Sequence, residues 1–313
     1  MKFSNPNETL LFSHTDFILL GFPGVVTSRR LLAFPFSAVY GLILMGNVVI
    51  LHRIWVEKAL RSPMYNLIAL LFAVNISCTT AIVPKALTGL LLGLDGIGLR
   101  DCLFQMFYIY TAVMFESSVL LMMALDRYVA ICKPLRYHHI MTKSLLLKLS
   151  VVSAIQCGLW TSPIIIVASR VRFCRSNVIL NFLCENMVLL NLACGDVSRL
   201  QIVGLAVRIA VTGLDITVLL ISYSKILYTA LHAVSRSDRR KALHTCGTHL
   251  LVVVLNYSCG LLSSMAYRMD ISVDIQNLTS AVYFLFPATV HPIIYGFRVK
   301  EIKASLLKSW GMA

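Results

Sequence analysis

Seven long apolar stretches constrain this chain more than any other feature of its sequence. A bilayer with a hydrocarbon core about 30 Å thick needs roughly 20 mostly apolar residues to be crossed by one helix. The stretches that meet this requirement are 31–54, 64–88, 102–125, 144–168, 200–224, 242–266 and 277–297. Only 13% of the residues are charged, whereas soluble domains carry about 25%. The sequence therefore predicts an all-α fold, a seven-transmembrane-helix bundle over residues 31–297.

The charges between these stretches predict an orientation. With the N-terminus outside, bases gather in the cytoplasmic segments, at 53–61, 133–148, 225–241 and 298–308. Such an excess of Lys and Arg marks the cytoplasmic side, although three arginines at 170–175 oppose it. We therefore expect a plasma-membrane protein whose residues 1–30 are extracellular.

Both ends of the chain carry a further signal. Asn7 begins an Asn-Glu-Thr glycosylation sequon, which has meaning only on the extracellular side. Residues 298–313 form the predicted cytoplasmic tail, and its segment FRVKEIKASLLKSW alternates bases with apolar residues. That pattern is typical of a short amphipathic helix lying on the inner leaflet.

The composition and motifs disfavour several classes of protein. The formal net charge is +14, but the bases lie in short clusters between apolar segments, so the expected partner is a lipid bilayer and no nucleic acid. We find no GxSxG, HExxH or phosphate-loop motif, which predicts no enzyme and no cofactor. Cys246 and His249 alone are too sparse for a metal site. An odd number of spans without paired broken helices disfavours the usual transporters, although it leaves a channel open.

The nine cysteines divide between two environments. Cys102, Cys174, Cys184 and Cys194 fall on the predicted extracellular side, where disulfides persist. Two bridges among these four would fix the long loop after the fourth stretch.

Charged and polar groups inside the apolar stretches are the candidate functional residues. The segment MALDRYVAIC places Asp126 beside Arg127 at the end of the third stretch. Such a pair suits a segment with two conformations whose populations a ligand bound outside can shift. The alternative is a plain ion pair at the membrane interface. Glu116 lies deep in the same stretch and Asn75 deep in the second, and an acid in a membrane helix is expensive and usually functional.

The sixth stretch carries a polar stripe. Tyr257, Leu261, Ser264 and Arg268 are spaced 4, 3 and 4 apart, which places them on one helical face. Arg268 lies near the outer end, where it either extends into water or directs its donors into a cavity to hold a carboxylate.

Several motifs in this order are together typical of one family. They are Gly46-Asn47, Pro63-Met64-Tyr65, MALDRYVAIC, Ser222-Tyr223, KALHTCGTHL at 241–250 and HPIIYG at 291–296. The chain, from Asn7 to about Trp310, resembles the rhodopsin-like G-protein-coupled receptors, and within them the class I (fish-like) olfactory receptors. An opsin is disfavoured because 277–297 contains no Lys. A rhodopsin-like receptor for another small ligand or a peptide remains the alternative.

The resemblance implies a switch and two disulfides. In the family, the arginine matching Arg127 is held by the acid matching Asp126 until the sixth helix swings outward. It then contacts a heterotrimeric G protein, here of the stimulatory olfactory type. Three tyrosines belong to this switch, and the implied disulfides pair four cysteines. These residues are Tyr128, Tyr223 and Tyr295, with the pairs Cys102–Cys184 and Cys174–Cys194.

The resemblance also implies a pocket for a small-molecule odorant. Arg268 would engage a ligand carboxylate, with support from Ser264. Tyr110 matches another pocket-lining position. Four further residues lie near the pocket or would close it, and packing is the alternative for them: Met106, Phe107, Met114 and Met187. In the family an acidic pair matching Asn75 and Glu116 can hold a sodium ion. Here Asn75 replaces the usual aspartate, which puts the ion site in doubt. His291 replaces the family's asparagine, and the two departures together leave altered basal activity open.

Overall fold

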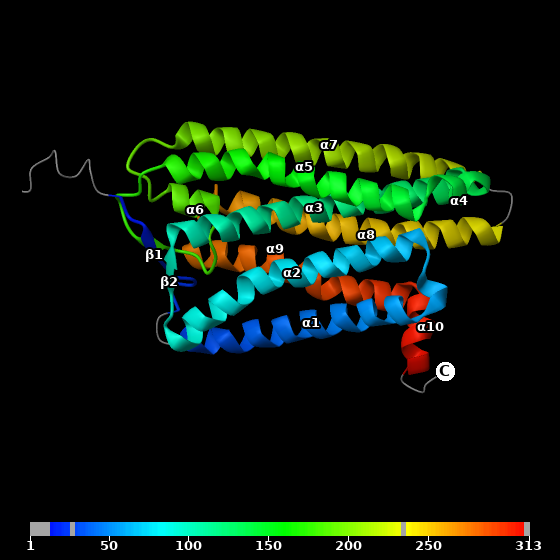
Figure 1. The fold of residues 1–313 in the computed structure, drawn as a ribbon, viewed down its shortest axis with the longest axis horizontal. Helices are drawn as coiled ribbons and strands as arrows, with labels where there is room; N and C mark the ends of the chain where they lie inside the picture. The colour runs from blue at the N-terminus through cyan, green and yellow to red at the C-terminus, as the bar shows by residue number, and fades with distance from the viewer. Residues whose placement is uncertain (1–12, 26–28, 233–235, 310–313) are drawn as a thin grey trace, which may run out of the picture.

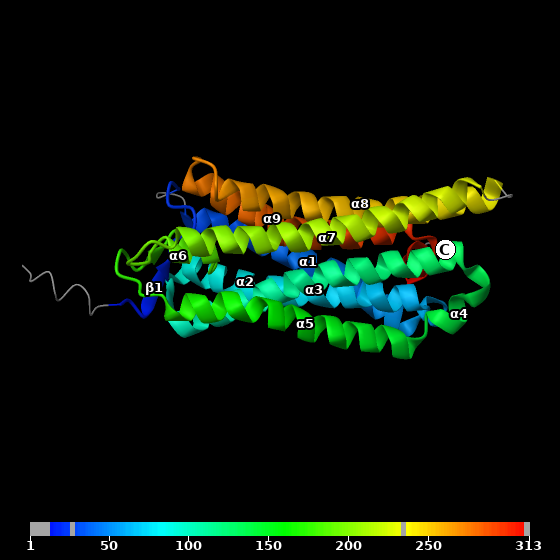
Figure 2. The same ribbon diagram turned by 90° about the horizontal axis from the view of Figure 1, so that it is seen from above.

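The computed structural model describes residues 13–25, 29–232 and 236–309. Within them, seven helices are long and apolar enough to cross a membrane, which confirms the predicted bundle (Figures 1 and 2). They are α1 (Ala33–Val56), α2 (Pro63–Leu92), α3 (Leu99–Cys132), α5 (Lys143–Arg170), α7 (Ser198–Leu231), α8 (Arg236–Ala266) and α9 (Val273–Arg298). The shorter helices are η1 (Arg29–Leu32), η2 (Lys58–Leu60), η3 (Pro134–Arg136), α4 (Tyr137–Ile140), α6 (Asn186–Leu190) and α10 (Lys300–Ser309).

Helix α3 is central to the bundle, since it contacts α2, α5, α7 and α8. The surfaces of α5 and α7 that face away from it are rich in exposed aliphatic side chains, such as Leu159 and Leu220. Soluble proteins place such apolar side chains inside, but apolar side chains on the outer surface are expected where lipid tails cover the helices.

The contact between α1 and α9 compensates for a proline. Pro292 has no backbone N–H, so the carbonyl of Ala288, four residues earlier, lacks its helical donor. Asn47 supplies one, with its Nδ2 atom 2.9 Å from the Ala288 oxygen. A Cβ atom on Gly46 would lie only 3.2 Å from the Pro292 side chain, so the close approach of these helices depends on that glycine.

A small sheet caps one end of the bundle, which we call the sheet end. Its strands are β1 (Asp16–Leu19), β2 (Gly96–Gly98) and β3 (Val178–Ile179), in the order β2-β1-β3. Strand β1 pairs antiparallel with β2 and parallel with β3. This sheet ties the N-terminal segment to two loops, and it is not among the elements predicted from the sequence.

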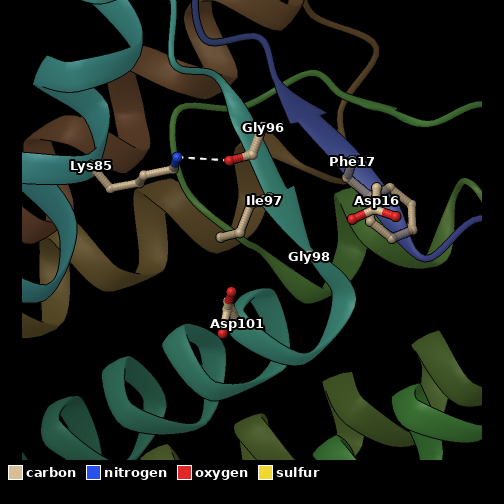
Figure 3. Close-up of a pocket in the computed structure, with 7 residues that line it drawn as sticks. All are labelled: Asp16, Phe17, Lys85, Gly96, Ile97, Gly98 and Asp101. Carbon is tan, nitrogen blue, oxygen red and sulfur yellow. Dashed lines mark hydrogen bonds between the residues drawn. The ribbon is translucent and has the colours of Figure 1, made fainter.

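Arg29 strengthens that attachment. Its guanidinium forms an ion pair with Asp95 at 3.2 Å and donates to the carbonyls of Leu19 and Gly21. A cavity of about 440 Å³ lies beside β2, lined by Asp16, Phe17, Lys85, Gly96, Ile97, Gly98 and Asp101 (Figure 3). Lys85 reaches across it to donate to the Gly96 carbonyl at 2.7 Å.

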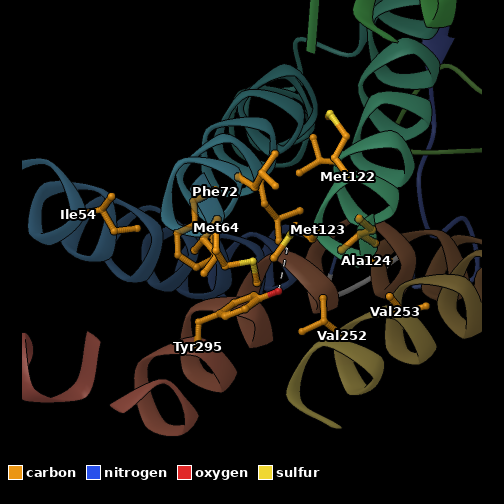
Figure 4. Close-up of a cluster of buried hydrophobic side chains, with 14 of the residues drawn as sticks. Ile54, Met64, Phe72, Met122, Met123, Ala124, Val252, Val253 and Tyr295 are labelled. Atoms are coloured by element: carbon orange, nitrogen blue, oxygen red, sulfur yellow. Dashed lines mark hydrogen bonds between the residues drawn. The ribbon is translucent and has the colours of Figure 1, made fainter. Parts of the chain in front are cut away.

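The opposite end of the bundle, which we call the switch end, carries Asp126 and Arg127. A cluster of buried apolar side chains from α1, α2, α3, α8 and α9 packs next to them (Figure 4). Within it the rings of Phe72 and Tyr295 meet edge to face, with centroids 5.8 Å apart.

The predicted amphipathic helix is α10, and it turns away from the bundle at the switch end (Figure 1). Its Ile302 is fully buried, and its Ser305 hydroxyl accepts a hydrogen bond from Arg53 Nε of α1 at 2.9 Å. The apolar face predicted for the tail thus packs against the bundle.

Candidate ligand and switch sites

Asp126 is completely buried and both of its carboxylate oxygens are occupied. Oδ2 accepts from Arg127 Nε at 3.1 Å and Nη2 at 2.5 Å. Oδ1 accepts from the Tyr137 hydroxyl at 2.8 Å. Burial, and then the charge of Asp126, raise the pKa of Tyr137, so this hydroxyl remains a donor. Tyr137, which follows the MALDRYVAIC segment on the short helix α4, is not among the switch residues predicted from the sequence.

The other switch tyrosines have different neighbours in this arrangement. The Tyr223 hydroxyl contacts His249 Nδ1 across the α7–α8 interface, and the Tyr295 hydroxyl lies 4.0 Å from Met123 Sδ. Tyr128 is partly buried against the apolar cluster. Asp126, rather than a tyrosine, therefore holds the Arg127 guanidinium here.

The two ion-site candidates lie in one polar network deep in the bundle. Glu116 accepts a hydrogen bond from Asn256 Nδ2 at 2.8 Å and lies 4.0 Å from His291 Nδ1. That same ring nitrogen is 3.3 Å from Asn75 Nδ2, which also donates to Asn47 Oδ1 at 3.2 Å. Side chains from five helices thus meet here, and His291 lies between the two residues that the sequence analysis singled out.

In the part of the chain that the structure describes, no three His, Cys, Asp or Glu side chains gather closely enough to hold a metal ion.

The residues that the spacing placed on one face of the sixth span differ in burial and in their partners. Tyr257 donates to Asp215 on α7 at 3.1 Å, and Ser264 is buried. Leu261, by contrast, is 62% exposed beside the equally exposed Leu262. The structure therefore places Leu261 toward the outside of the bundle, and its assignment to a ligand pocket needs this correction.

Arg268 lies in the turn just beyond α8 and folds back onto the end of that helix. Its Nη1 atom donates to the Ser264 carbonyl at 2.6 Å and to the Ser264 hydroxyl at 3.0 Å. Partial burial, and then the nearby charge of Arg208, lower the pKa of Arg268, while the charge of Glu185 raises it. Arg208 donates to the Gly260 carbonyl at 3.0 Å and lies 5.9 Å over the Tyr283 ring.

Tyr110 on α3 is held by the loop above it. Its hydroxyl donates to Glu185 Oε1 at 3.2 Å and accepts from the Asn186 backbone at 3.0 Å. Glu185 also caps α6, because its Oε2 accepts from the backbone of Met187 and Val188. Burial raises the pKa of Glu185, against the lowering effect of these hydrogen bonds and of Arg208.

The remaining predicted pocket residues pack in different ways. Met106 is fully buried in an apolar cluster that also contains Cys102 and Cys184, which favours packing over ligand contact. Met114 Sδ accepts from the Thr161 hydroxyl at 3.6 Å. Phe107 and Met187 are partly buried. None of the predicted ligand residues lines the 440 Å³ cavity of Figure 3.

Two disulfides position the loop that carries Glu185. The structure contains Cys102–Cys184 and Cys174–Cys194, the pairs that the resemblance implied. The first ties the loop to the start of α3, and the Cys184 backbone N–H donates to Gln105 Oε1 at 3.0 Å. Asn7 lies outside the described residues.

A family model described as olfactory receptor matches residues 36–311, nearly the whole chain. The chain belongs to the olfactory receptor family. As a member of this family it is a multi-pass membrane protein that senses odorants through the G-protein-coupled receptor fold, and it is not an enzyme.

Similar olfactory receptors match over almost their full lengths. The chain is 35% identical to human olfactory receptor 52P1 over 303 residues, which cover 95% of this chain and 94% of the relative. It is 38% identical to human olfactory receptor 52R1 over 289 residues, 92% of each chain. It is 33% identical to mouse olfactory receptor 51E2 over 298 residues, 95% of this chain and 93% of the relative. This set of relatives is consistent with the class I assignment.

Proposed function

We propose that this olfactory receptor binds a small, carboxylate-bearing odorant at the sheet end and activates a stimulatory olfactory-type G protein at the switch end. It does so at the plasma membrane, with residues 1–30 outside the cell and the tail 298–313 inside.

The observation that carries the ligand class is a pair of arginines near a single acid at the sheet end. Arg208 and Arg268 both lie within electrostatic range of Glu185 and of each other. Among the described residues, neither arginine has a carboxylate within ion-pair distance. Two guanidinium groups near one acid suit an anionic ligand, because a guanidinium can hold a carboxylate through two parallel hydrogen bonds.

Replacing Arg268 tests this assignment. Arg268→Ala is expected to abolish cAMP responses to carboxylic acids in cells that also express the stimulatory G protein, with surface expression near that of the parent. The exposed Arg199, at the start of α7, gives a matched control, and Arg199→Ala should respond as the parent does. Acid responses that are the same in Arg268→Ala and in the parent would show that Arg268 does not bind the ligand.

The switch is tested separately. Arg127→Ala removes the guanidinium that Asp126 holds, so signalling should be lost while binding of a labelled ligand persists. Loss of both binding and signalling would indicate a misfolded protein, and retained signalling would refute the role of Arg127.

The orientation has its own test. An epitope tag before residue 1 should be accessible on intact cells, and a tag after residue 313 should be accessible only after permeabilisation. Both tags in one compartment would contradict an odd number of membrane crossings.

A further inference from the structure

A second cavity lies at the switch end, on the outer surface formed by α1, α2 and the start of α5. It is a groove of about 700 Å³. Along α1 it is lined by Val48, Leu51 and Trp55, and Trp55 is 79% exposed. The groove thus lies on the helix surface that faces the bilayer, away from both candidate sites described above.

Apart from His52, the groove is apolar along α1, and it is basic where α1 ends. Arg61 follows α1 and precedes α2, and Lys143 is the first residue of α5, so both belong to the switch end. Both side chains are exposed and both line the groove. A tryptophan between an apolar segment and two bases is the arrangement expected at the boundary between hydrocarbon and headgroups.

The two bases are not neutralised by the protein. In the part of the chain that the structure describes, no acidic residue lines the groove, and neither Arg61 nor Lys143 has an ion pair. The nearest acid in the sequence, Glu57, faces Arg53 at 3.8 Å. Among the described residues, the charged side chains of Arg61 and Lys143 therefore have no acidic partner beside the apolar part of the groove.

We propose that this groove binds an anionic phospholipid of the cytoplasmic leaflet. Arg61 and Lys143 contact the lipid phosphate, and one acyl chain lies along Val48 and Leu51. A soluble anion would leave the apolar part of the groove unused, and a neutral lipid would leave both bases without a partner. Basic pockets at the cytoplasmic ends of membrane helices suit anionic headgroups for this electrostatic reason. The assignment to that leaflet rests on the orientation proposed above.

The full-length receptor, purified in a neutral detergent, allows the proposal to be tested without reference to orientation. Phosphatidylserine with brominated acyl chains quenches the fluorescence of a nearby tryptophan, and a titration gives its affinity. Quenching should saturate for the parent and lose its largest component in Trp55→Phe. Equal quenching in the parent and in Trp55→Phe would overturn the proposed position of the acyl chain.

Charge variants test the headgroup contact. Each base near an anionic lipid surface contributes about fivefold in affinity, so Arg61→Gln with Lys143→Gln should weaken binding by about 30-fold. Arg61→Lys with Lys143→Arg should bind as the parent does. Lys148→Gln is the matched control, because Lys148 is an exposed lysine of the same helix outside the groove.

Three results would overturn the proposal. They are unchanged affinity in the double Gln variant, equal affinity for brominated phosphatidylcholine, and full competition by glycerophosphoserine, which carries the headgroup without acyl chains. The epitope-tag experiment on intact cells tests the orientation separately. It therefore shows which leaflet the groove faces, whatever lipid the groove binds.

Discussion

Replacing Asn256 by leucine is expected to raise the ligand-free signalling of this olfactory receptor. Asn256 Nδ2 donates to Glu116 Oε1 at 2.8 Å and so joins α8 to α3. The family resemblance implies that the sixth membrane helix, here α8, swings outward when the G protein is engaged, which would separate it from α3. A hydrogen bond present only before that movement stabilises the resting arrangement, and its loss favours the active one.

The magnitude follows from the burial of the pair. The Glu116 side chain is only 14% exposed, so water cannot easily replace the hydrogen bond that the substitution removes. A hydrogen bond contributes about 1 kcal/mol when both groups are neutral and up to about 3 kcal/mol when one is charged. The equilibrium between resting and active receptor should therefore shift by about 5-fold to 150-fold.

The assay is cAMP accumulation without ligand, normalised to receptor at the cell surface. Glu116→Gln is the matched control, because its carbonyl oxygen can still accept from Asn256, and its basal signalling should rise less than that of Asn256→Leu. Basal signalling in Asn256→Leu that equals the parent at equal surface expression would refute the reasoning. An equal rise in Glu116→Gln would show that charge, rather than this hydrogen bond, sets the equilibrium.

Three further predictions concern the loop and the switch. Cys184→Ser opens a bridge between residues separated by 82 positions, which constrains the unfolded chain by roughly 4–5 kcal/mol, so antibody staining should find little receptor at the cell surface. Because burial raises the pKa of Glu185, its contribution to stability is complete below the usual glutamate pKa and is lost as pH rises through the raised value. Thermal unfolding of the purified receptor should show that loss, and Glu185→Gln should remove this pH dependence. Tyr137→Phe deletes a donor to the buried Asp126 carboxylate, which should destabilise the receptor by about 1.5–3 kcal/mol in the same unfolding measurement.

The positions of the membrane spans could be predicted because hydrophobicity is a property of each segment alone. The stretch 64–88 corresponds to α2, Pro63–Leu92, and 102–125 corresponds to α3, Leu99–Cys132. The helices extend beyond the apolar stretches, because a helix keeps its backbone hydrogen bonds on leaving the hydrocarbon and polar side chains are tolerated there.

The sheet could not be predicted in this way. Strand β1 pairs with β2, about 80 residues later, and with β3, about 160 residues later. Each strand is at most four residues long, too short for an alternating pattern to stand out from chance. Such pairing depends on loops that the bundle and the disulfides bring together.

The candidate sites were predicted in part, for a geometric reason. Helical spacing gives the direction of a residue around its axis, but neither the rotamer nor the partner helix. It therefore grouped Leu261 with Ser264, although one is exposed and the other buried. It also identified Glu116 without indicating that Asn256 would be its partner, since that contact depends on how α3 and α8 pack.

Adjacent residues of α8 explain how one movement can affect several contacts. Successive side chains on a helix point about 100° apart, and here Asn256 meets Glu116 on α3 while Tyr257 meets Asp215 on α7. Arg268 lies eleven residues beyond Tyr257, just past the end of α8. In the proposed function, an odorant held by Arg268 would therefore act on the end of the helix that carries both contacts. A displacement of α8 would strain the links to α3 and α7 together, so both contacts would contribute to the coupling between the proposed odorant site and the switch.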